Sequence, residues 1–331
     1  AYGGAEAGVV AYSMAIQELA RVDAAVAVTT SVTNMVAEIL LAFGTDEQKR
    51  VFIPRITSGE AIAGSFALSE AGAGSDPGAM KTKAERRGDV YIVNGEKMWI
   101  TSGAHAGVII LFARTGEGQG TRGLSTFIVT PDLPGFSVGR EEDKMGIRSS
   151  NTVSLAFDDC EIPADRLLGE PGGGFKVAMA ALDGGRIGIA SQALGIAQGA
   201  LDAAARYANE RVQFGQPIAA FQSIQTKLAD MATQVDAARM LTLRAAWLKQ
   251  AGRRYTREAS MAKLYASEMA NRVCGDAIQI HGGYGYVKEF DVERFYREAR
   301  VTTIYEGTSE VQRIVIAREV LRQAAQGATW S

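Results

Sequence analysis

The chain contains few of the side chains that build zinc sites and disulfide scaffolds. Its 331 residues include two cysteines, Cys160 and Cys274, and two histidines, His105 and His281. The cysteines lie far apart and form no CxxC pattern, so too few soft ligands are present for an ordinary Cys/His zinc site. We expect neither a disulfide-based fold nor a bound metal.

The chain also lacks an excess of charge and a long apolar run. Lys and Arg total 35 and Asp and Glu total 37, so the net charge of -2 provides no electrostatic footprint for nucleic acid. The longest strongly apolar stretch, residues 108–113, is far shorter than the roughly 18 residues that suggest a membrane span. Neither nucleic acid nor a membrane span is therefore expected.

The first ten residues, AYGGAEAGVV, contain no initiator methionine, no basic segment and no sustained apolar segment. A signal peptide is therefore not visible. The glycines around Tyr2 are more typical of a loop than of the start of a domain, so we expect the N-terminal region to be incomplete.

The composition predicts a globular protein with a large core. Hydrophobic residues make up 47% of the chain and charged residues 22%, which excludes intrinsic disorder, and the length predicts two or three domains. Helix patterns are followed by strand patterns and then by helix patterns again. We predict an α+β fold with a truncated N-terminal helical domain at 1–60, a middle antiparallel β-domain at 61–172 and a C-terminal antiparallel helical bundle at 173–331.

Local signals support this order of elements. Gly44 ends one predicted helix, and Thr45 is suited to cap the next one. β-Formers gather in six runs, at 61–68, 90–93, 98–101, 108–114, 124–130 and 152–157. Between two of these runs, Asn94-Gly95 predicts a hairpin turn. In the C-terminal region, one buried helix face is predicted by the helical spacing of Ile224, Leu228, Met231 and Val235.

The segment IYEGTSEVQR places a carboxylate in an apolar setting at the entry to a helix. Glu306 lies between Tyr305 and Gly307, before the hydroxyl residues that can cap the helix. Burial raises the pKa of a carboxyl group because the charged form loses water, and this prepares the group to accept a proton near neutral pH. The alternative is an exposed loop acid, and the residue alone does not decide between the two.

Two segments of the predicted β-domain are suited to hold a planar ring or a phosphate. FALSEAGAGSD, at 66–76, is a strand that runs into a loop with glycines and with hydroxyls at Ser69 and Ser75. Glycine lets backbone N–H groups approach a ligand closely. MWITSG, at 98–103, adds an aromatic ring and two hydroxyls. The alternatives are an ordinary glycine-rich turn and a tryptophan packed in the core.

Three segments of the predicted bundle carry further polar groups. RVQFG begins at Arg211 and is followed by Gln222, and QIHGGYG begins at Gln279. An arginine suits a pyrophosphate, and adjacent glycines let an adenosine lie close to the backbone. The alternative is a helix C-cap at Gly282 with an exposed arginine. In DGGR, Arg186 could pair with a core acid or lie over a buried carboxylate.

Taken together and in order, FALSEAGAGSD, MWITSG, DGGR, RVQFG, QIHGGYG and IYEGTSEVQR resemble the acyl-CoA dehydrogenases. These are FAD-dependent enzymes that introduce an α,β double bond into acyl-CoA thioesters. The resemblance covers essentially the whole chain and is nearest to the short-chain, butyryl-CoA type. It implies that roughly fifty residues of the family's N-terminal helices are missing before the first residue, more than boundary error explains.

The resemblance implies a bound FAD. In the first two motifs, the family positions that hold the flavin match Phe66, Ala67, Leu68, Ser69, Ser75, Trp99, Ile100 and Thr101. Family members also reach the FAD of a neighbouring subunit, through positions that match Arg211, Phe214, Gln222, Gln279, Gly282 and Gly283. Two more positions near FAD match Thr308 and Glu310.

The resemblance also implies the reaction and the substrate contacts. Glu306 matches the base that removes the α-proton while the β-hydrogen leaves as hydride to flavin N5, giving a trans-2-enoyl-CoA. The positions that line the acyl-CoA site match Ser75, Asp183, Gly184, Gly185, Arg186, Tyr305 and Gly307. Some family members carry the base immediately before the arginine, where this chain has Gly185, which cannot serve.

The partners that the resemblance implies are an acyl-CoA substrate, an electron-transfer flavoprotein as electron acceptor and further copies of the chain, usually in a tetramer built as a dimer of dimers. The compartment would be the cytoplasm in a bacterium and the mitochondrial matrix in a eukaryote. One alternative is an acyl-CoA oxidase, whose reduced flavin reacts with oxygen. A DNA-binding relative of the fold is disfavoured because the C-terminal helices carry acids among their arginines: Glu258, Glu268, Glu289, Glu293 and Glu298.

Overall fold

The chain folds as two compact units in the computed structural model, which describes residues 2–116 and 120–327. The sheet unit comprises Ala1–Glu6, Thr29–Asp143 and Ser149–Leu182. The bundle unit comprises Ala7–Val28, Lys144–Arg148 and Asp183–Ser331. Helices, then strands, then helices follow along the chain, so the predicted α+β fold with this order is confirmed. The predicted ranges 1–60 and 173–331 include residues 1 and 328–331, which lie outside the described residues.

The sheet unit contains one mixed sheet of eight strands, in the order β6-β7-β3-β2-β4-β5-β8, with β1 added beside β4. Most neighbours pair antiparallel, as predicted, whereas β1 and β2 each pair with β4 in parallel. The strands are β1 (Ala63–Ala67), β2 (Lys83–Arg87), β3 (Val90–Thr101), β4 (Ala106–Arg114), β5 (Leu124–Val129), β6 (Phe136–Glu141), β7 (Thr152–Pro163) and β8 (Leu167–Leu168). Two short 3₁₀ turns join them, η1 (Pro77–Ala79) and η2 (Ala164–Arg166).

The hairpin predicted at Asn94-Gly95 is wrong, because both residues lie inside β3. Gly95 has φ 146° at a register shift in the ladder with β7, and a Cβ on it would lie 2.7 Å from Thr82 Cα. Asn94 instead exchanges two hydrogen bonds of 2.9 Å with Asp159, through its side-chain amide. The glycine therefore serves a close approach of neighbouring strands, and the turn before β3 uses Gly88.

Helix α3 (Asp46–Thr57) begins where the sequence predicts. The hydroxyl of Thr45 accepts a hydrogen bond from the Gln48 N–H at 3.2 Å, and the Gln48 side chain accepts one from the Thr45 N–H at 3.0 Å. This reciprocal capping box satisfies two backbone donors that a helix start leaves unpaired. Gln48 also donates to the Leu167 carbonyl at 2.9 Å, which ties the start of α3 to the end of the sheet.

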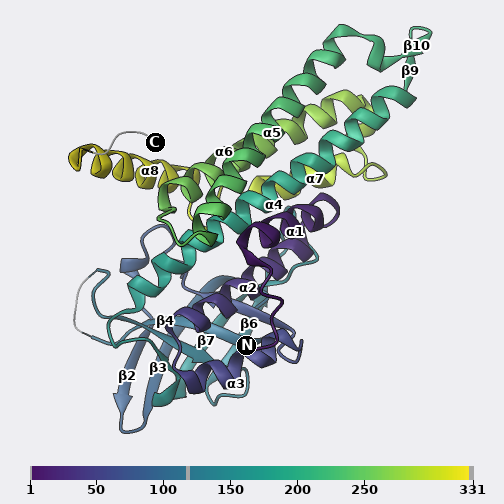
Figure 1. Ribbon diagram of the computed structural model, residues 1–331. Coiled ribbons are helices and arrows are strands. Elements are labelled where there is room, and N and C mark those ends of the chain that lie inside the picture. Colours follow the sequence, from purple (N-terminus) through teal and green to yellow (C-terminus); the bar gives the residue numbers. More distant parts are fainter. Residues whose placement is uncertain (1, 117–119, 328–331) are drawn as a thin grey trace. The chain divides into compact units, whose positions relative to one another are not determined.

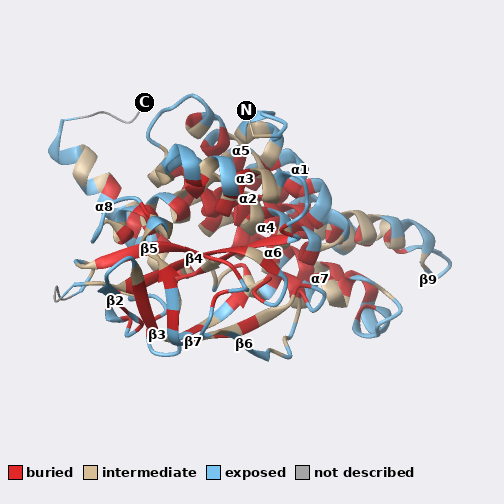
Figure 2. Cartoon of the chain, turned by 90° about the horizontal axis from the view of Figure 1, so that it is seen from below, coloured by how far each residue is buried: buried red, intermediate tan, exposed pale blue. Residues whose placement is uncertain are grey.

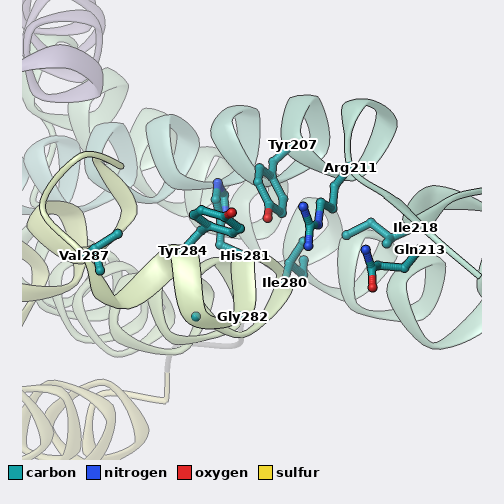
Figure 3. A pocket seen from close by; sticks show the side chains of 10 residues that line it. Tyr207, Arg211, Gln213, Ile218, Ile280, His281, Gly282, Tyr284 and Val287 are labelled. Carbon is teal, nitrogen blue, oxygen red and sulfur yellow. The ribbon is translucent and has the colours of Figure 1, made fainter.

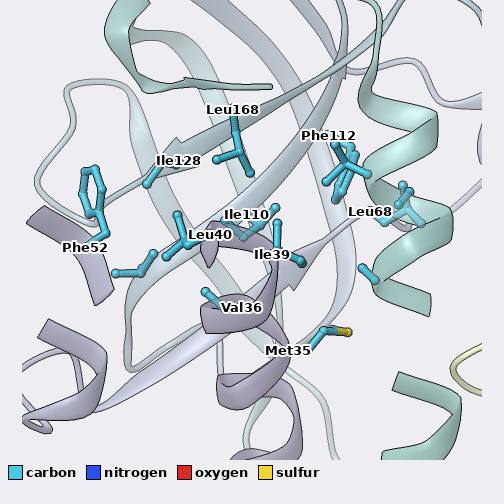
Figure 4. Packing of buried hydrophobic residues seen from close by; sticks show 14 of the residues in the cluster. Met35, Val36, Ile39, Leu40, Phe52, Leu68, Ile110, Phe112, Ile128 and Leu168 are labelled. Carbon is cyan, nitrogen blue, oxygen red and sulfur yellow. The ribbon is translucent and has the colours of Figure 1, made fainter. Parts of the chain in front are cut away.

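Helix α2 (Ala24–Phe43) supplies the apolar face that covers the sheet. Within the sheet unit, its residues Val36, Ile39 and Leu40 pack into one buried cluster with Ile110 and Phe112 of β4, as Figure 4 shows. By length and composition, with a mean hydropathy of 1.6, α2 is also long and apolar enough to cross a membrane. The core helix of a soluble protein passes the same test, so this resemblance is weak evidence for a span.

The strands of the sheet differ in how far their residues are buried. Figure 2 shows β4 and β5 in the colour of buried residues over most of their length, and every residue of β5 is buried. Strands β2 and β6 are largely exposed, with the sequences KAERR and FSVGRE. Because these two strands carry few β-formers, the sequence runs did not predict them.

The bundle unit is built from long helices. They are α1 (Gly8–Val22), α4 (Gly174–Glu210), α5 (Gln222–Gln250), α6 (Thr256–His281), α7 (Val292–Val301) and α8 (Ser309–Ala325), with the first residues of α4 belonging to the sheet unit. Helices α5 and α6 pack against each other (Figure 1). The short β9 (Val212–Gln213) and β10 (Gln216–Pro217), with η3 (Ile218–Ala220), connect α4 to α5, and η4 (Gly282–Tyr286) follows α6.

Two glycines of α4 let α1 pack directly on its backbone. A Cβ at Gly195 would lie 2.2 Å from the Gln17 carbonyl oxygen, and one at Gly199 would lie 2.5 Å from that of Arg21. On the predicted buried face of α5, Met231 and Val235 are buried while Ile224 and Leu228 are half-buried. The core of the bundle therefore begins about two turns into α5.

Candidate functional site

Glu306 lies in a turn that holds two successive residues in the left-handed region. Its φ is 55° and that of Gly307 is 86°, immediately before Thr308 caps α8 by accepting a hydrogen bond from the Val311 N–H. A residue other than glycine is disfavoured in this region, and such strain is kept where surrounding contacts enforce it. Gln312 provides one of these contacts, since its side-chain amide donates to the Gly307 carbonyl at 2.9 Å.

The Glu306 carboxyl group is partly withdrawn from water and incompletely bonded. Its Oε1 is buried and has no hydrogen-bond partner among the described residues. Burial raises the pKa of Glu306 to about 7, although the positive charges of Arg186 and Lys263 act in the opposite direction. A carboxyl group with a pKa near the working pH is suited to take up and release a proton.

Arg186 provides one of the two positive charges near Glu306. It lies on α4 with 4% of its surface exposed, and burial lowers its pKa. Its Nη1 donates to Asp183 Oδ1 at 2.6 Å and to Ser260 Oγ at 3.3 Å, while Asp183 also accepts a hydrogen bond from Thr256 at 2.6 Å. The buried Nε has no partner in the described part of the chain. Of the two alternatives raised by the sequence, the structure shows the pairing with an acid, Asp183, whereas a position over a buried carboxylate stays a prediction.

Lys263, the second positive charge, was missed by the sequence analysis. It lies on α6 with none of its surface exposed, and its Nζ donates to the Gly307 carbonyl at 2.7 Å. Burial lowers the pKa of Lys263 to about 8, against an opposing effect of Glu306. A signal was present in the sequence: this lysine stands at helical spacing from Ala259 and Ala266, on a face of small residues that is typical of a buried helix surface.

Other polar atoms around the turn also lack partners. Tyr305 donates its hydroxyl proton to Gln192 Oε1, and Gln192 donates to the Ala24 carbonyl at 2.9 Å. Within residues 2–116 and 120–327, the buried Ser309 Oγ and Gln312 Oε1 have no hydrogen-bond partner. Buried polar atoms of native proteins are normally paired, so unpaired ones around a strained turn indicate a place for a ligand or for water.

The two flavin motifs of the sheet unit lie side by side. The Met98 N–H donates to the Ser69 carbonyl at 2.9 Å, and Ser65 Oγ donates to the Thr101 carbonyl at 2.7 Å. The side chains of three predicted contacts, Ala67, Leu68 and Ile100, are buried in the core, so they can offer a ligand their backbone only.

The remaining sheet-unit predictions are more accessible. The indole of Trp99 is 57% exposed and its φ is 65°. Ser75 is exposed, whereas Phe66, Ser69 and Thr101 are half-buried. A Cβ placed on Gly72 or Gly74 would meet nothing within 4 Å, so the loop leaves open space beside its backbone.

A buried ion pair holds this loop. Lys97 of β3 is fully buried, and its Nζ donates to Glu70 Oε1 at 2.8 Å and to the Leu68 carbonyl at 3.1 Å. Glu70 also accepts hydrogen bonds from the Lys81 and Thr82 N–H groups at 2.6 and 3.0 Å. Burial acts to raise the pKa of Glu70, but these hydrogen bonds and the charge of Lys97 outweigh it and lower the pKa.

Three of the predicted bundle residues line one pocket of about 500 Å³, shown in Figure 3. Arg211, Gly282 and Gly283 share it with the aromatic rings of Tyr207 and Tyr284. The Arg211 guanidinium carbon lies 5.3 Å from the Tyr284 ring centroid. The His281 ring stacks on Tyr207 with the ring centroids 4.1 Å apart, and its Nδ1 lies 2.8 Å from the Ala277 carbonyl oxygen.

The other predicted positions of the bundle lie elsewhere. Phe214, Gln222 and Gln279 are exposed and do not line this pocket. Gly184 and Gly185 are part of α4, between Asp183 and Arg186. Glu310 is exposed in the first turn of α8, while the Thr308 hydroxyl is used in the helix cap. No group of three His, Cys, Asp or Glu side chains able to hold a metal is found in the part of the chain that the structure describes.

The chain matches known protein families along most of its length. Three family models match along the chain: the acyl-CoA dehydrogenase N-terminal domain at residues 1–60, the middle domain at 65–160 and the C-terminal domain at 172–321. The chain belongs to the acyl-CoA dehydrogenase family. The resemblance derived from the six motifs is confirmed, and the protein is an FAD-dependent oxidoreductase of this family.

Individual relatives are similar over nearly the whole chain. The human mitochondrial short-chain specific acyl-CoA dehydrogenase is 52% identical, over 97% of this chain and 78% of its own length. An acyl-CoA dehydrogenase of Bacillus subtilis is 51% identical, over 97% and 84%. Acryloyl-CoA reductase (NADH) of Anaerotignum propionicum is 48% identical, over 97% and 82%.

Two solved structures are similar in fold. Butyryl-CoA dehydrogenase of Megasphaera elsdenii has a TM-score of 0.95 at 47% identity, covering 97% of this chain and 85% of its own. A structure from work on the electron transferring flavoprotein of Acidaminococcus fermentans has a TM-score of 0.96 at 48% identity, covering 97% and 84%. The enzyme therefore shares its fold with short-chain members of the family.

The chemistry of the residues fits the FAD that the family uses. FAD has a planar ring system, a pyrophosphate and an adenosine. The sheet unit offers an exposed indole and an open glycine loop, while the bundle pocket offers an arginine, aromatic rings and two glycines beside open space. These groups suit stacking on a ring, charge pairing with a pyrophosphate and close approach of a nucleoside.

Proposed function

We propose that this enzyme removes the α-proton and the β-hydrogen of a short-chain acyl-CoA thioester, with Glu306 as the catalytic base. The observation that carries the proposal is the Glu306 carboxyl group, whose buried Oε1 has no hydrogen-bond partner among the residues that the structure describes and whose pKa is raised by burial to about 7. The similarity to the short-chain dehydrogenases supports a short acyl chain.

The reaction removes two hydrogens from adjacent carbons. The ionised Glu306 takes the α-proton, and the β-hydrogen leaves as hydride, so that a trans double bond forms between the two carbons. FAD, when bound, supplies the acceptor for that hydride. Hydrogen bonds to the thioester carbonyl stabilise the negative charge that develops as the α-proton leaves.

The residues around Glu306 have separate roles in the proposal. Arg186 keeps a positive charge near the carboxyl group and is itself oriented by Asp183. Gly307, whose backbone conformation only glycine adopts easily, keeps the turn free of a side chain beside the thioester. We assign Tyr305, Gly184 and Gly185 to the same acyl-CoA site, together with Ser75 of the sheet unit.

We assign the FAD contacts as the family resemblance implies. Phe66, Ala67, Leu68, Ser69, Ser75, Trp99, Ile100 and Thr101 would hold the flavin end, with the buried members contributing backbone groups. Arg211, Phe214, Gln222, Gln279, Gly282 and Gly283 would hold the FAD of a neighbouring copy, and Thr308 and Glu310 would lie near FAD. The exposed side chains of Phe214 and Tyr286, at 93% and 86%, support an oligomer with an interface here.

Further parts of the prediction rest on the relatives. We propose an electron-transfer flavoprotein as the electron acceptor, supported by the structure from the Acidaminococcus fermentans work, and a tetramer as the assembly. Mitochondrial and Bacillus relatives support the matrix or the cytoplasm as the compartment. The division at 1–60, 61–172 and 173–331 stays a prediction, supported by the change from α3 to β1 and by the start of α4 at Gly174.

The experiment uses Glu306→Gln, which keeps the shape of the side chain and removes its basicity. Purified wild-type protein and variant are mixed anaerobically with butyryl-CoA, and bleaching of the flavin absorbance is followed. The variant should keep its flavin and bind the thioester, yet bleach about a hundredfold to ten-thousandfold more slowly, because general-base catalysis is lost. Exchange of the α-proton with solvent should fall in parallel. Near-normal bleaching in Glu306→Gln would remove this residue from the mechanism.

The similarity to an acryloyl-CoA reductase favours one second candidate, reduction of a short enoyl-CoA. The same residues serve both directions, since Glu306 would return a proton to the α-carbon. Anaerobic assays with butyryl-CoA plus an electron acceptor, and with acryloyl-CoA plus a reductant, separate the two directions. Reoxidation by air at the rate of turnover would instead support the oxidase alternative.

A further inference from the structure

Lys263 is a buried cation that has no role in the proton transfer proposed for Glu306. It lies on α6, whereas Glu306 lies in the turn before α8. None of its surface is exposed, and its ammonium group donates a hydrogen bond of 2.7 Å to the Gly307 carbonyl. Burial of a charge is costly unless it is paired, so the position needs a compensating interaction.

The bond of Lys263 holds the strained part of the turn. Gly307 is the residue directly after Glu306, and both have positive φ. The same Gly307 carbonyl also accepts the hydrogen bond from Gln312, so two donors from two helices orient one peptide group. This peptide group joins Gly307 to Thr308 and directly follows the backbone of Glu306, and Gln312 also donates to the Glu306 carbonyl at 3.3 Å, so Lys263 and Gln312 together hold the turn that carries the carboxyl group.

The charge of Lys263 reaches the Glu306 carboxyl group as well. Arg186 and Lys263 are the two groups that lower the pKa of Glu306 against the effect of burial. Two other glutamates act on Lys263 more weakly than Glu306 does. Arg186, Lys263, Tyr305 and Glu306 have charged and titratable neighbours on four helices. These groups come from α4 (Asp183, Arg186), from α6 and the residue before it (Tyr255, Lys263, Glu268), from α7 (Glu298), and from α8 and the turn before it (Tyr305, Glu306, Glu310, Arg318).

We propose that Lys263 is a positioning residue for the Glu306 base: its ammonium group holds the Gly307 carbonyl and supplies a positive charge to the turn that carries the Glu306 carboxyl group. This inference rests on the proposed function of Glu306. It assigns to Lys263 two effects, one on the direction of the turn and one on the protonation of the carboxyl group, and the second effect distinguishes it from a residue that only stabilises the fold.

The test measures the protonation of Glu306 directly. The carbonyl stretch of the protonated carboxyl group is followed by infrared difference titration of the substrate-free holoprotein, and the band that disappears in Glu306→Gln is assigned to Glu306. Lys263→Met should move the midpoint of this band to higher pH by on the order of one pH unit, the size expected when a nearby opposite charge is removed. The midpoint of the bleaching rate against pH should move equally.

Two further variants separate the charge from the fold. Lys263→Arg keeps a positive charge and should keep the wild-type midpoint. Lys263→Gln keeps a donor for Gly307 but removes the charge, so it should show the same upward shift even if Lys263→Met does not fold. The control is Lys227→Met, which removes a half-exposed lysine that bonds Asp276 on α6 at 2.7 Å and should leave the midpoint unchanged.

The outcomes distinguish the two proposals. If Glu306→Gln retains both the band and the bleaching rate, Glu306 is not the base and the role of Lys263 falls with it. If Glu306→Gln loses both, but the folded Lys263 variants titrate with the wild-type midpoint, the function of Glu306 stands and the inference on Lys263 is overturned. If the Lys263 variants bleach more slowly but keep the wild-type titration midpoint of Glu306, Lys263 only stabilises the fold and the inference is likewise overturned.

Discussion

Arg186 Nη1 lies 2.6 Å from Asp183 Oδ1, one turn away on the same helix, while the buried Nε of the same guanidinium has no hydrogen-bond partner among the described residues. Asp183 therefore orients the Arg186 side chain but leaves the Nε donor of its guanidinium group unpaired in the described part of the chain. The positive charge remains available to the Glu306 carboxyl group, whose pKa it lowers against the effect of burial. Removing this cation should consequently change when Glu306 is ionised.

Arg186→Met should move the pH at which the bleaching rate is half-maximal upward by on the order of one pH unit. The sign follows from the charge: without the cation, ionised Glu306 is less stable, and its pKa rises above the value of about 7. The pH profile of anaerobic bleaching checks this. Arg186→Lys, which keeps a positive charge, is the matched control and should shift less. An unchanged midpoint in Arg186→Met would show that Arg186 does not act on the base.

The sequence predicted Glu306 more readily than its surroundings. Six ordered motifs indicated the family and therefore the base. Each motif covers only a short stretch of chain, so it does not indicate contacts with residues far away in the sequence. Lys263 reaches Gly307 across 44 residues, and an isolated lysine in a helix pattern is usually exposed. The small residues Ala259 and Ala266 on the same face of α6 indicate a buried surface, but they do not indicate that Lys263 bonds the turn at Gly307.

The hairpin expected at Asn94-Gly95 failed for a related reason. The dipeptide favours a two-residue turn locally, but the approach of Thr82 and the bonds of Asn94 to Asp159 come from other strands. In contrast, the cap at Thr45 was predicted correctly, because a capping box involves only residues three apart. Local chemistry was therefore predictable here, whereas contacts between distant strands and helices were not.

Glu306→Gln should stabilise the folded protein at about pH 8 while it slows flavin bleaching about a hundredfold to ten-thousandfold. The pKa of Glu306 is about 7 in the folded protein and 4.5 in its ordinary state, so between these values the folded state holds the extra proton. Stability therefore falls as pH rises through this range. The glutamine amide carries no charge, so the free energy of unfolding should rise by about 1–3 kcal/mol, the cost typical of an unsatisfied buried group. Urea unfolding of both proteins at about pH 8 and about pH 5 checks this, with little gain at the lower pH.

Lys97→Met should destabilise the sheet unit by about 3–5 kcal/mol, because it leaves the Glu70 carboxylate buried without its cation. The loss should also weaken flavin retention, since Lys97 holds the Leu68 carbonyl at the base of the glycine loop. Urea unfolding and the flavin-to-protein absorbance ratio measure the two effects. The control is Lys83→Met on β2, where the lysine is exposed and the cost should stay within about 0.5 kcal/mol. Equal costs for both variants would contradict a structural role of the ion pair.

Arg211→Ala should weaken FAD retention on the order of tenfold or more, as expected for the loss of a hydrogen bond to a charged group. Arg211 lines the bundle pocket beside Tyr284 and two glycines, where its charge suits a pyrophosphate. If the pocket holds the FAD of a neighbouring copy, the variant should lose oligomer and FAD together. Sedimentation with detection at the flavin wavelength reports both at once. Arg206→Ala, which removes an exposed arginine near the C-terminal end of α4, is the control and should change neither. Wild-type protein that stays yellow after dilution to a monomer would contradict binding across subunits, because a pocket completed by another copy cannot retain its ligand alone.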